Sequence, residues 1–133
     1  MKIYISGPIT GTKDYMERFK AAEDTLKQYG HEVVNPAAAL AGLPASTTHK
    51  EYMDISIALL KLCDTILMLD NWRYSKGSCI ELDYAIRNGI TVVFEGGAGC
   101  EVKSQNRLGK ENLMTKLGRR LYTGIAANVY SVK

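Results

Sequence analysis

The stretch Asp64-Thr65-Ile66-Leu67-Met68-Leu69 decides the fold, because it is apolar at nearly every position. Successive residues of a β-strand point to opposite faces of the sheet, so a strand with one wet face alternates between polar and apolar residues. An unbroken apolar run is instead typical of a strand in a parallel sheet, where helices cover both faces. The stretch therefore predicts a central strand of an α/β protein.

The sequence on both sides of this strand supplies the remaining elements of such a sheet. Apolar spacing and the positions of Gly, Pro and Asn predict further strands and helices. The predicted strands are residues 2–6, 31–34, 64–69 and 90–94, with a last one near 128–132. The predicted helices are residues 13–29, 49–62, 79–88 and 108–121. Residues 37–46 are expected to be irregular and 75–78 to form a turn.

Strands and helices alternate along the chain, which predicts a doubly wound, mostly parallel five-stranded sheet of the flavodoxin-like or Rossmann-like kind, with helices on both faces. The 133 residues are one domain's worth of sequence, so we expect a single domain over residues 1–133. No apolar run approaches the ~20 residues that would span a bilayer, and the start of the chain does not resemble a signal peptide. We expect a cytoplasmic protein without membrane contact.

Charge and cysteine content exclude several classes of protein. The three cysteines show no C-x-x-C or zinc-finger spacing, and neither His31 nor His49 has a neighbour at ligand spacing, so no metal and no cofactor is predicted. Of the net charge of +3, residues 95–133 carry seven basic against three acidic side chains. This basic segment is either a solvated helix face or a surface for an anionic partner. Without interleaved aromatic residues it does not predict nucleic-acid binding.

The ligand crevice of a doubly wound sheet lies beyond the carboxyl ends of its strands. The first loop there, Gly7-Pro8-Ile9-Thr10-Gly11, either cradles an anion with its backbone N–H groups or is a plain tight turn. Asn35-Pro36 follows the second strand at the same edge. Trp72 follows the third strand, where it either lines the site for a ring-shaped ligand or covers the core.

The segment Ser75-Lys76-Gly77-Ser78-Cys79-Ile80-Glu81 carries more information, because a glycine, two hydroxyls and the start of a helix converge there. Glu81 is either a reactive carboxylate or a favourable partner of the helix dipole in the first turn. Asp54 and Tyr4 can lean toward the same crevice, although Asp54 also fits a solvated helix position and Tyr4 an ordinary core position. Two carboxylates at one small site are the equipment of glycosidic bond chemistry.

Three motifs together resemble the nucleoside 2-deoxyribosyltransferase superfamily. They are Tyr4-Ile5-Ser6-Gly7-Pro8, then Tyr52-Met53-Asp54 followed by Cys63-Asp64, and then Ser75 to Leu82 with its Ser-x-Gly-x-x-x-Glu pattern. The resemblance covers residues 2–94 and is closest to a small branch common in bacterial and phage genomes. It implies that Glu81 is the nucleophile, that Tyr4 holds it, and that Asp54 orients or protonates the departing base.

The resemblance also implies a substrate. Nucleotide hydrolases of the superfamily place a serine six residues before the nucleophile for the 5′-phosphate, and here that residue is Ser75, whereas transferases acting on free nucleosides place an aspartate there. The expected function is thus an N-glycosidase of nucleoside 5′-monophosphates, with a 2-deoxyribosyltransferase or a non-catalytic nucleotide-binding module as alternatives. A homodimer or larger assembly is expected. The expected substrate-binding residues are Ser6, Gly7, Pro8, Ile9, Thr10, Gly11, Asn35, Pro36, Trp72, Ser75, Gly77 and Ser78.

Overall fold

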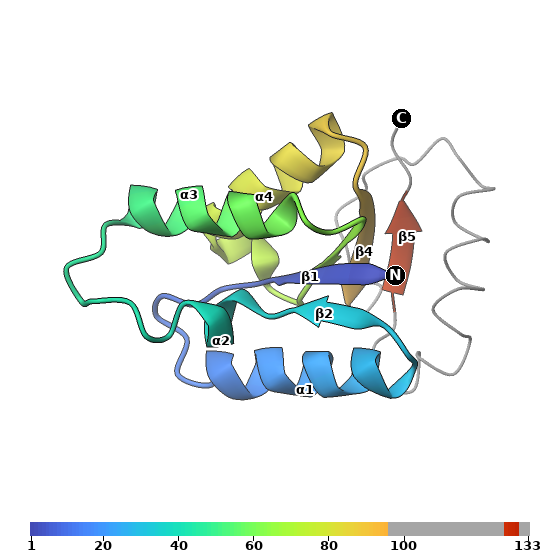
Figure 1. Ribbon diagram of the computed structural model, residues 1–133, viewed down its shortest axis with the longest axis horizontal. Helices are drawn as coiled ribbons and strands as arrows, with labels where there is room; N and C mark the ends of the chain where they lie inside the picture. The colour runs from blue at the N-terminus through green and yellow to red at the C-terminus, as the bar shows by residue number, and fades with distance from the viewer. Residues whose placement is uncertain (96–126, 131–133) are drawn as a thin grey trace.

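The computed structural model describes residues 1–95 and the backbone of residues 127–130 (Figure 1). Its strands are β1 (Lys2–Ser6), β2 (Glu32–Val34), β3 (Thr65–Met68), β4 (Thr91–Glu95) and β5 (Ala127–Tyr130). Its helices are α1 (Tyr15–Gln28), α2 (Pro36–Ala39), α3 (His49–Leu60) and α4 (Lys76–Arg87), with a 3-10 turn at Trp72–Tyr74. The helix predicted at 108–121 lies outside the described residues.

The five strands form one sheet in the order β2-β1-β3-β4-β5. The first four strands are parallel, and β5 pairs antiparallel to β4. The predicted mostly parallel, five-stranded α/β sheet is therefore confirmed. The order reverses direction between β1 and β3, which is where ligands bind in folds of this kind.

Helices cover both faces of the sheet, as the apolar central strand predicted. In Figure 1, α1 and α2 lie on one side of the sheet, and α3 and α4 lie on the other. Side chains of β3 alternate between the two cores: Leu67 belongs to the cluster under α1, whereas Ile66 and Met68 belong to the cluster under α3 and α4. No helix in residues 1–95 is both long enough and apolar enough to cross a bilayer.

Three local features differ from the sequence-based expectation. The segment expected to be irregular begins with the short helix α2, because Asn35 caps it and Pro36 occupies its first turn. Helix α4 begins at Lys76, so the predicted turn at 75–78 is its cap and first turn. Glu81 consequently lies in the second turn of α4, beyond the turn where the helix dipole acts on side chains.

Trp72 packs on Phe94, with ring centroids 5.7 Å apart, and so belongs to the core.

The first loop leaves β1 through a close contact that only glycine permits. A Cβ added at Gly7 would lie 2.9 Å from Leu69 Cδ1 and 3.0 Å from Leu69 Cβ, so the Leu69 side chain would have to shift. We expect Gly7→Ala to lower the free energy of unfolding by about 1–3 kcal/mol, as overpacking does in cores. Chemical denaturation measures the change.

Gly42→Ala is the matched control, since an added Cβ there meets nothing within 4 Å. It should leave stability unchanged or raise it by up to ~1 kcal/mol, because alanine restricts the unfolded chain. Equal effects of the two substitutions would show that the contact with Leu69 is not the cause.

Candidate active site

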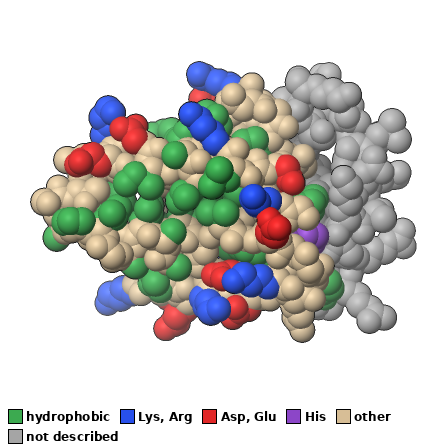
Figure 2. Space-filling model, viewed as in Figure 1, with side chains coloured by type: hydrophobic (Ala, Val, Ile, Leu, Met, Phe, Trp, Pro, Cys, Tyr) green, Lys and Arg blue, Asp and Glu red, His purple; other side chains and the backbone are tan. Residues whose placement is uncertain are grey.

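A cavity of about 770 Å³ opens at the carboxyl ends of the strands, where the first loop and the starts of α2, α3 and α4 meet. Figure 2 shows hydrophobic side chains gathered on this side of the molecule, between α3 and α1. Most of the residues predicted from the sequence reach the cavity. Those that line it are Tyr4, Gly7, Ile9, Thr10, Pro36, Ser75, Gly77, Ser78 and Glu81.

Glu81 is the chemical centre of this cavity. Its side chain projects from α4 toward β1 and is only 6% exposed. Ser6 donates a hydrogen bond to Glu81 Oε1 at 2.7 Å, and the phenol of Tyr4 donates to Oε2. Two hydroxyl donors on one strand therefore hold both oxygens of one carboxylate, which fixes its orientation.

Burial changes the proton affinity of this pair. Desolvation raises the pKa of Glu81 to about 7, although the hydrogen bonds from Tyr4 and Ser6 oppose the shift. Burial, the Glu81 charge and the hydrogen bond to Glu81 raise the pKa of Tyr4 well above its usual value, with a hydrogen bond from Ser56 acting the other way. Tyr4 thus stays a donor, while Glu81 changes charge near neutral pH.

Asp54, the second carboxylate predicted for the site, is not brought to Glu81. Its side chain is 64% exposed and pairs with Lys50 at 2.8 Å. The face of α3 that lines the cavity carries His49, Tyr52, Met53 and Ser56, at positions i, i+3, i+4 and i+7. Asp54 follows Met53 by one residue, a rotation of about 100° around the helix, which turns it away from the cavity.

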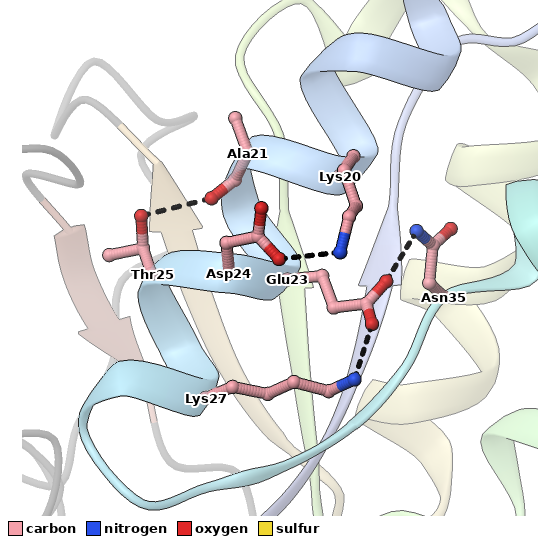
Figure 3. A network of polar contacts seen from close by, with 7 residues as sticks. All are labelled: Lys20, Ala21, Glu23, Asp24, Thr25, Lys27 and Asn35. Atoms are coloured by element: carbon pink, nitrogen blue, oxygen red, sulfur yellow. Dashed lines mark hydrogen bonds and ion pairs between the residues drawn. The ribbon is translucent and has the colours of Figure 1, made fainter.

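Five other predicted residues lie outside the cavity lining. Ser6 is one of them, but it supports Glu81 directly. Trp72 lies in the core, and Pro8 and Gly11 belong to the loop, where Gly11 adopts a left-handed turn conformation with φ +77°. Asn35 accepts from the N–H of Ala38 and donates to Glu23, which also pairs with Lys27 (Figure 3). Asn35 therefore has a structural role at the start of α2.

Several residues line the cavity that the sequence reasoning did not select. They are Ile5, Tyr15, Phe19, Ala37, Leu40, Ala41, His49, Tyr52, Met53, Ser56, Tyr74 and Lys76. The helical spacing from His49 to Ser56 was a readable signal for four of them. Ser56 is the most informative of them. It lies on the same helix as Asp54, and its side chain forms a hydrogen bond with Tyr4.

The start of α4 forms the polar wall of the cavity. Ser75 caps the helix, its Oγ accepting from the N–H of Ser78 at 3.1 Å. The hydroxyl of Ser78 is buried and has no hydrogen-bond partner in the described part of the chain. The first N–H groups of a helix lack acceptors within the helix and carry partial positive charge, so this wall suits an anion. Residues 1–95 contain no group of three His, Cys, Asp or Glu side chains that could hold a metal ion.

The fold and this cavity define an α/β protein with a buried carboxylate at the switch point of a mostly parallel sheet. Residues 1–94 match the family described as "Domain of unknown function (DUF4406)", and the chain belongs to that family. No curated protein matches the sequence.

Among solved structures, the chain is similar to a 2-deoxyribosyltransferase from the psychrotolerant bacterium Bacillus psychrosaccharolyticus, described as a suitable biocatalyst for the industrial synthesis of antiviral and antitumoral nucleosides. The TM-score is 0.57 and the sequence identity 21%, over 69% of each chain. At this identity the likeness shows a shared fold, as the sequence motifs had led us to expect.

The raised pKa of Glu81 predicts a pH-dependent stability. A raised pKa in the folded state favours the protonated form, so its contribution is full below the ordinary pKa of 4.5 and is lost as pH rises through about 7. We expect Glu81→Gln, which cannot ionise, to gain stability relative to the unmodified protein over this interval. The expected gain is on the order of 3 kcal/mol and levels off above pH 7. Denaturant unfolding at several pH values measures it.

Asp83→Asn is the control for this measurement, because Asp83 lies on the same helix with a side chain 57% exposed. Its stability difference from the unmodified protein should vary with pH much less than that of Glu81→Gln, because the Asp83 side chain is exposed. A flat profile for Glu81→Gln as well would show that Glu81 is not desolvated in the folded protein.

Proposed function

We propose that the protein is an N-glycosidase that cleaves the bond between base and sugar in nucleoside 5′-monophosphates. The observation that carries the proposal is the buried Glu81 carboxylate, held by Tyr4 and Ser6 in a cavity whose wall is the start of the same helix. A nucleophile of this kind needs a fixed orientation, and the two hydrogen bonds to the buried carboxylate support that role.

The proposed reaction has two displacements at C1′ of the sugar. A Glu81 oxygen attacks C1′ while the bond from C1′ to the base nitrogen breaks, and the base leaves with that electron pair and takes a proton from solvent. Water then attacks C1′ while the bond from C1′ to the Glu81 oxygen breaks, and the water gives up a proton to solvent, which releases the sugar phosphate and returns the Glu81 carboxylate. Tyr4 and Ser6 keep the carboxylate oriented through both steps. Asp54 takes part in neither displacement, because its carboxylate is exposed to solvent and pairs with Lys50.

Phosphate recognition is assigned to the start of α4. Ser75 and Gly77 line the cavity there, and Glu81 follows Gly77 by four residues, a rise of about 6 Å along the helix axis. This spacing suits a nucleotide, whose 5′-phosphate and C1′ lie at opposite ends of the sugar. An aspartate in place of Ser75 would repel the phosphate, whereas a hydroxyl can donate to it.

A second candidate function is base exchange between nucleosides, in which a second base replaces water in the second displacement. The similar solved structure is a 2-deoxyribosyltransferase, and this favours the candidate. The two functions share Glu81 and its first step, so the acceptor distinguishes them.

The direct test is to incubate the purified protein with ribo- and deoxyribonucleoside 5′-monophosphates, and with the free nucleosides, and to follow base release by chromatography. We expect release from one or a few nucleotides, rising with pH through about 7 as Glu81 ionises. Glu81→Gln should lose at least about a hundredfold in rate. Asp83→Asn should retain the rate of the unmodified protein. Full activity in Glu81→Gln would disprove the mechanism, and binding without turnover would favour a nucleotide-binding module.

A separate test concerns Asp54. Its exposure and its pairing with Lys50 lead us to expect that Asp54→Asn keeps base release within about twofold, whereas removal of a true general acid typically costs roughly 10²–10⁴-fold. Initial rates with the best nucleotide measure the difference. A loss of that larger size would mean that α3 turns Asp54 into the cavity when substrate binds.

A further inference from the structure

His49 lies close to the start of α4, the part of the cavity to which phosphate recognition is assigned. It is the first residue of α3, and its ring lines the cavity opposite the start of α4. A Cβ built at Gly77 would lie 3.1 Å from Met53 Sδ, 3.8 Å from Ser75 Oγ and 4.0 Å from His49 Nε2. The imidazole, the serine hydroxyl and the Met53 thioether thus lie together around Gly77, in the first turn of α4.

The charges around this point favour an anion. Lys76 is the first residue of α4 and lines the cavity, whereas Glu81, the only carboxylate in the described lining, lies more than a turn further along the helix. The start of α3 is already occupied, because the Glu51 carboxylate accepts from the N–H of Thr48. The contribution of α3 to anion binding is therefore the His49 side chain rather than the backbone N–H groups of α3.

An independent feature favours a ligand at the start of α4. The Ser78 side chain, 1% exposed, lines the cavity in the first turn of α4, and its hydroxyl has no partner in the described residues. A buried hydroxyl without a partner costs free energy that a bound oxygen atom would recover.

We propose that His49 is a phosphate-binding residue that lets this cavity select nucleotides over nucleosides. The inference deepens the proposed function and rests on it for the identity of the ligand. His49 Nε2 donates a hydrogen bond to a 5′-phosphate oxygen, alongside Ser75 and the first N–H groups of α4. The imidazole is within reach from a separate helix, so α3 and α4 clamp the phosphate between them.

The test measures phosphate binding without catalysis. Ribose 5-phosphate carries the phosphate but has no base to lose, so calorimetric titration with it, and with ribose, reports affinity alone. We expect the unmodified protein to bind ribose 5-phosphate more tightly than ribose, and His49→Ala to weaken ribose 5-phosphate binding at least tenfold with no change for ribose. His49→Gln, which keeps an N–H donor of similar reach, should recover part of the affinity.

Lys50→Ala is the matched control, because Lys50 is the next residue of the same turn and its exposed ammonium pairs with Asp54. Its affinity for ribose 5-phosphate should stay within about twofold, since charges at exposed sites act weakly. An equal loss in Lys50→Ala and His49→Ala would overturn the proposal by showing a general charge effect.

The remaining outcomes separate this inference from the proposed function. Unchanged binding in His49→Ala, or no preference for ribose 5-phosphate over ribose in the unmodified protein, would overturn the role of His49 even if base release is observed. Loss of binding in His49→Ala alone would support that role even if no nucleotide is cleaved, and in that case the glycosidase proposal is the one that fails.

Discussion

The burial of one carboxylate among hydroxyl groups is the constraint on which the site depends. An ionised glutamate that is 6% exposed is costly unless donors surround it, and here Tyr4 and Ser6 supply them from β1. Those donors come from a strand fixed at the centre of the sheet between β2 and β3. Helix α4 has to pack against that strand for the contact to form, so the same packing that builds one core also positions Glu81.

The direction of the chain explains why the other polar groups gather in the same place. In a parallel sheet every helix that follows a strand begins near the carboxyl end of that strand, so helix starts, with their unpaired N–H groups, collect at one edge. The starts of α2, α3 and α4 all reach the cavity. The cavity therefore combines the polar start of α4 with apolar side chains such as Phe19, Leu40 and Met53.

The sequence was sufficient for the fold and for the residues on rigid elements. The apolar run at 64–69, the glycines Gly30 and Gly89 after two of the helices, and the Ser-x-Gly-x-x-x-Glu segment predicted the sheet. The motifs also placed Tyr4 and Glu81 in one cavity. The sequence did not show which way Asp54 points, because neighbouring residues of a helix are rotated by about 100° and the helix could not be oriented to within one residue. Trp72 was equally undetermined, since an aromatic residue after a strand fits a core as well as a ligand site. His49 was missed because it has no sequence neighbour of matching chemistry and meets the start of α4 only through tertiary packing.

The alternation of β1 has a consequence for how the chain can misfold. Tyr4 and Ser6 face α4, whereas Ile3 and Ile5 face the opposite core, and Tyr4 pairs in register with Ile66 of β3. A slip of β1 by one residue would point isoleucines at Glu81 and leave an ionised carboxylate in an apolar environment. Such a misaligned sheet would lose the hydrogen bonds to Glu81 and much of its stability together. The buried glutamate therefore disfavours misaligned forms of the sheet.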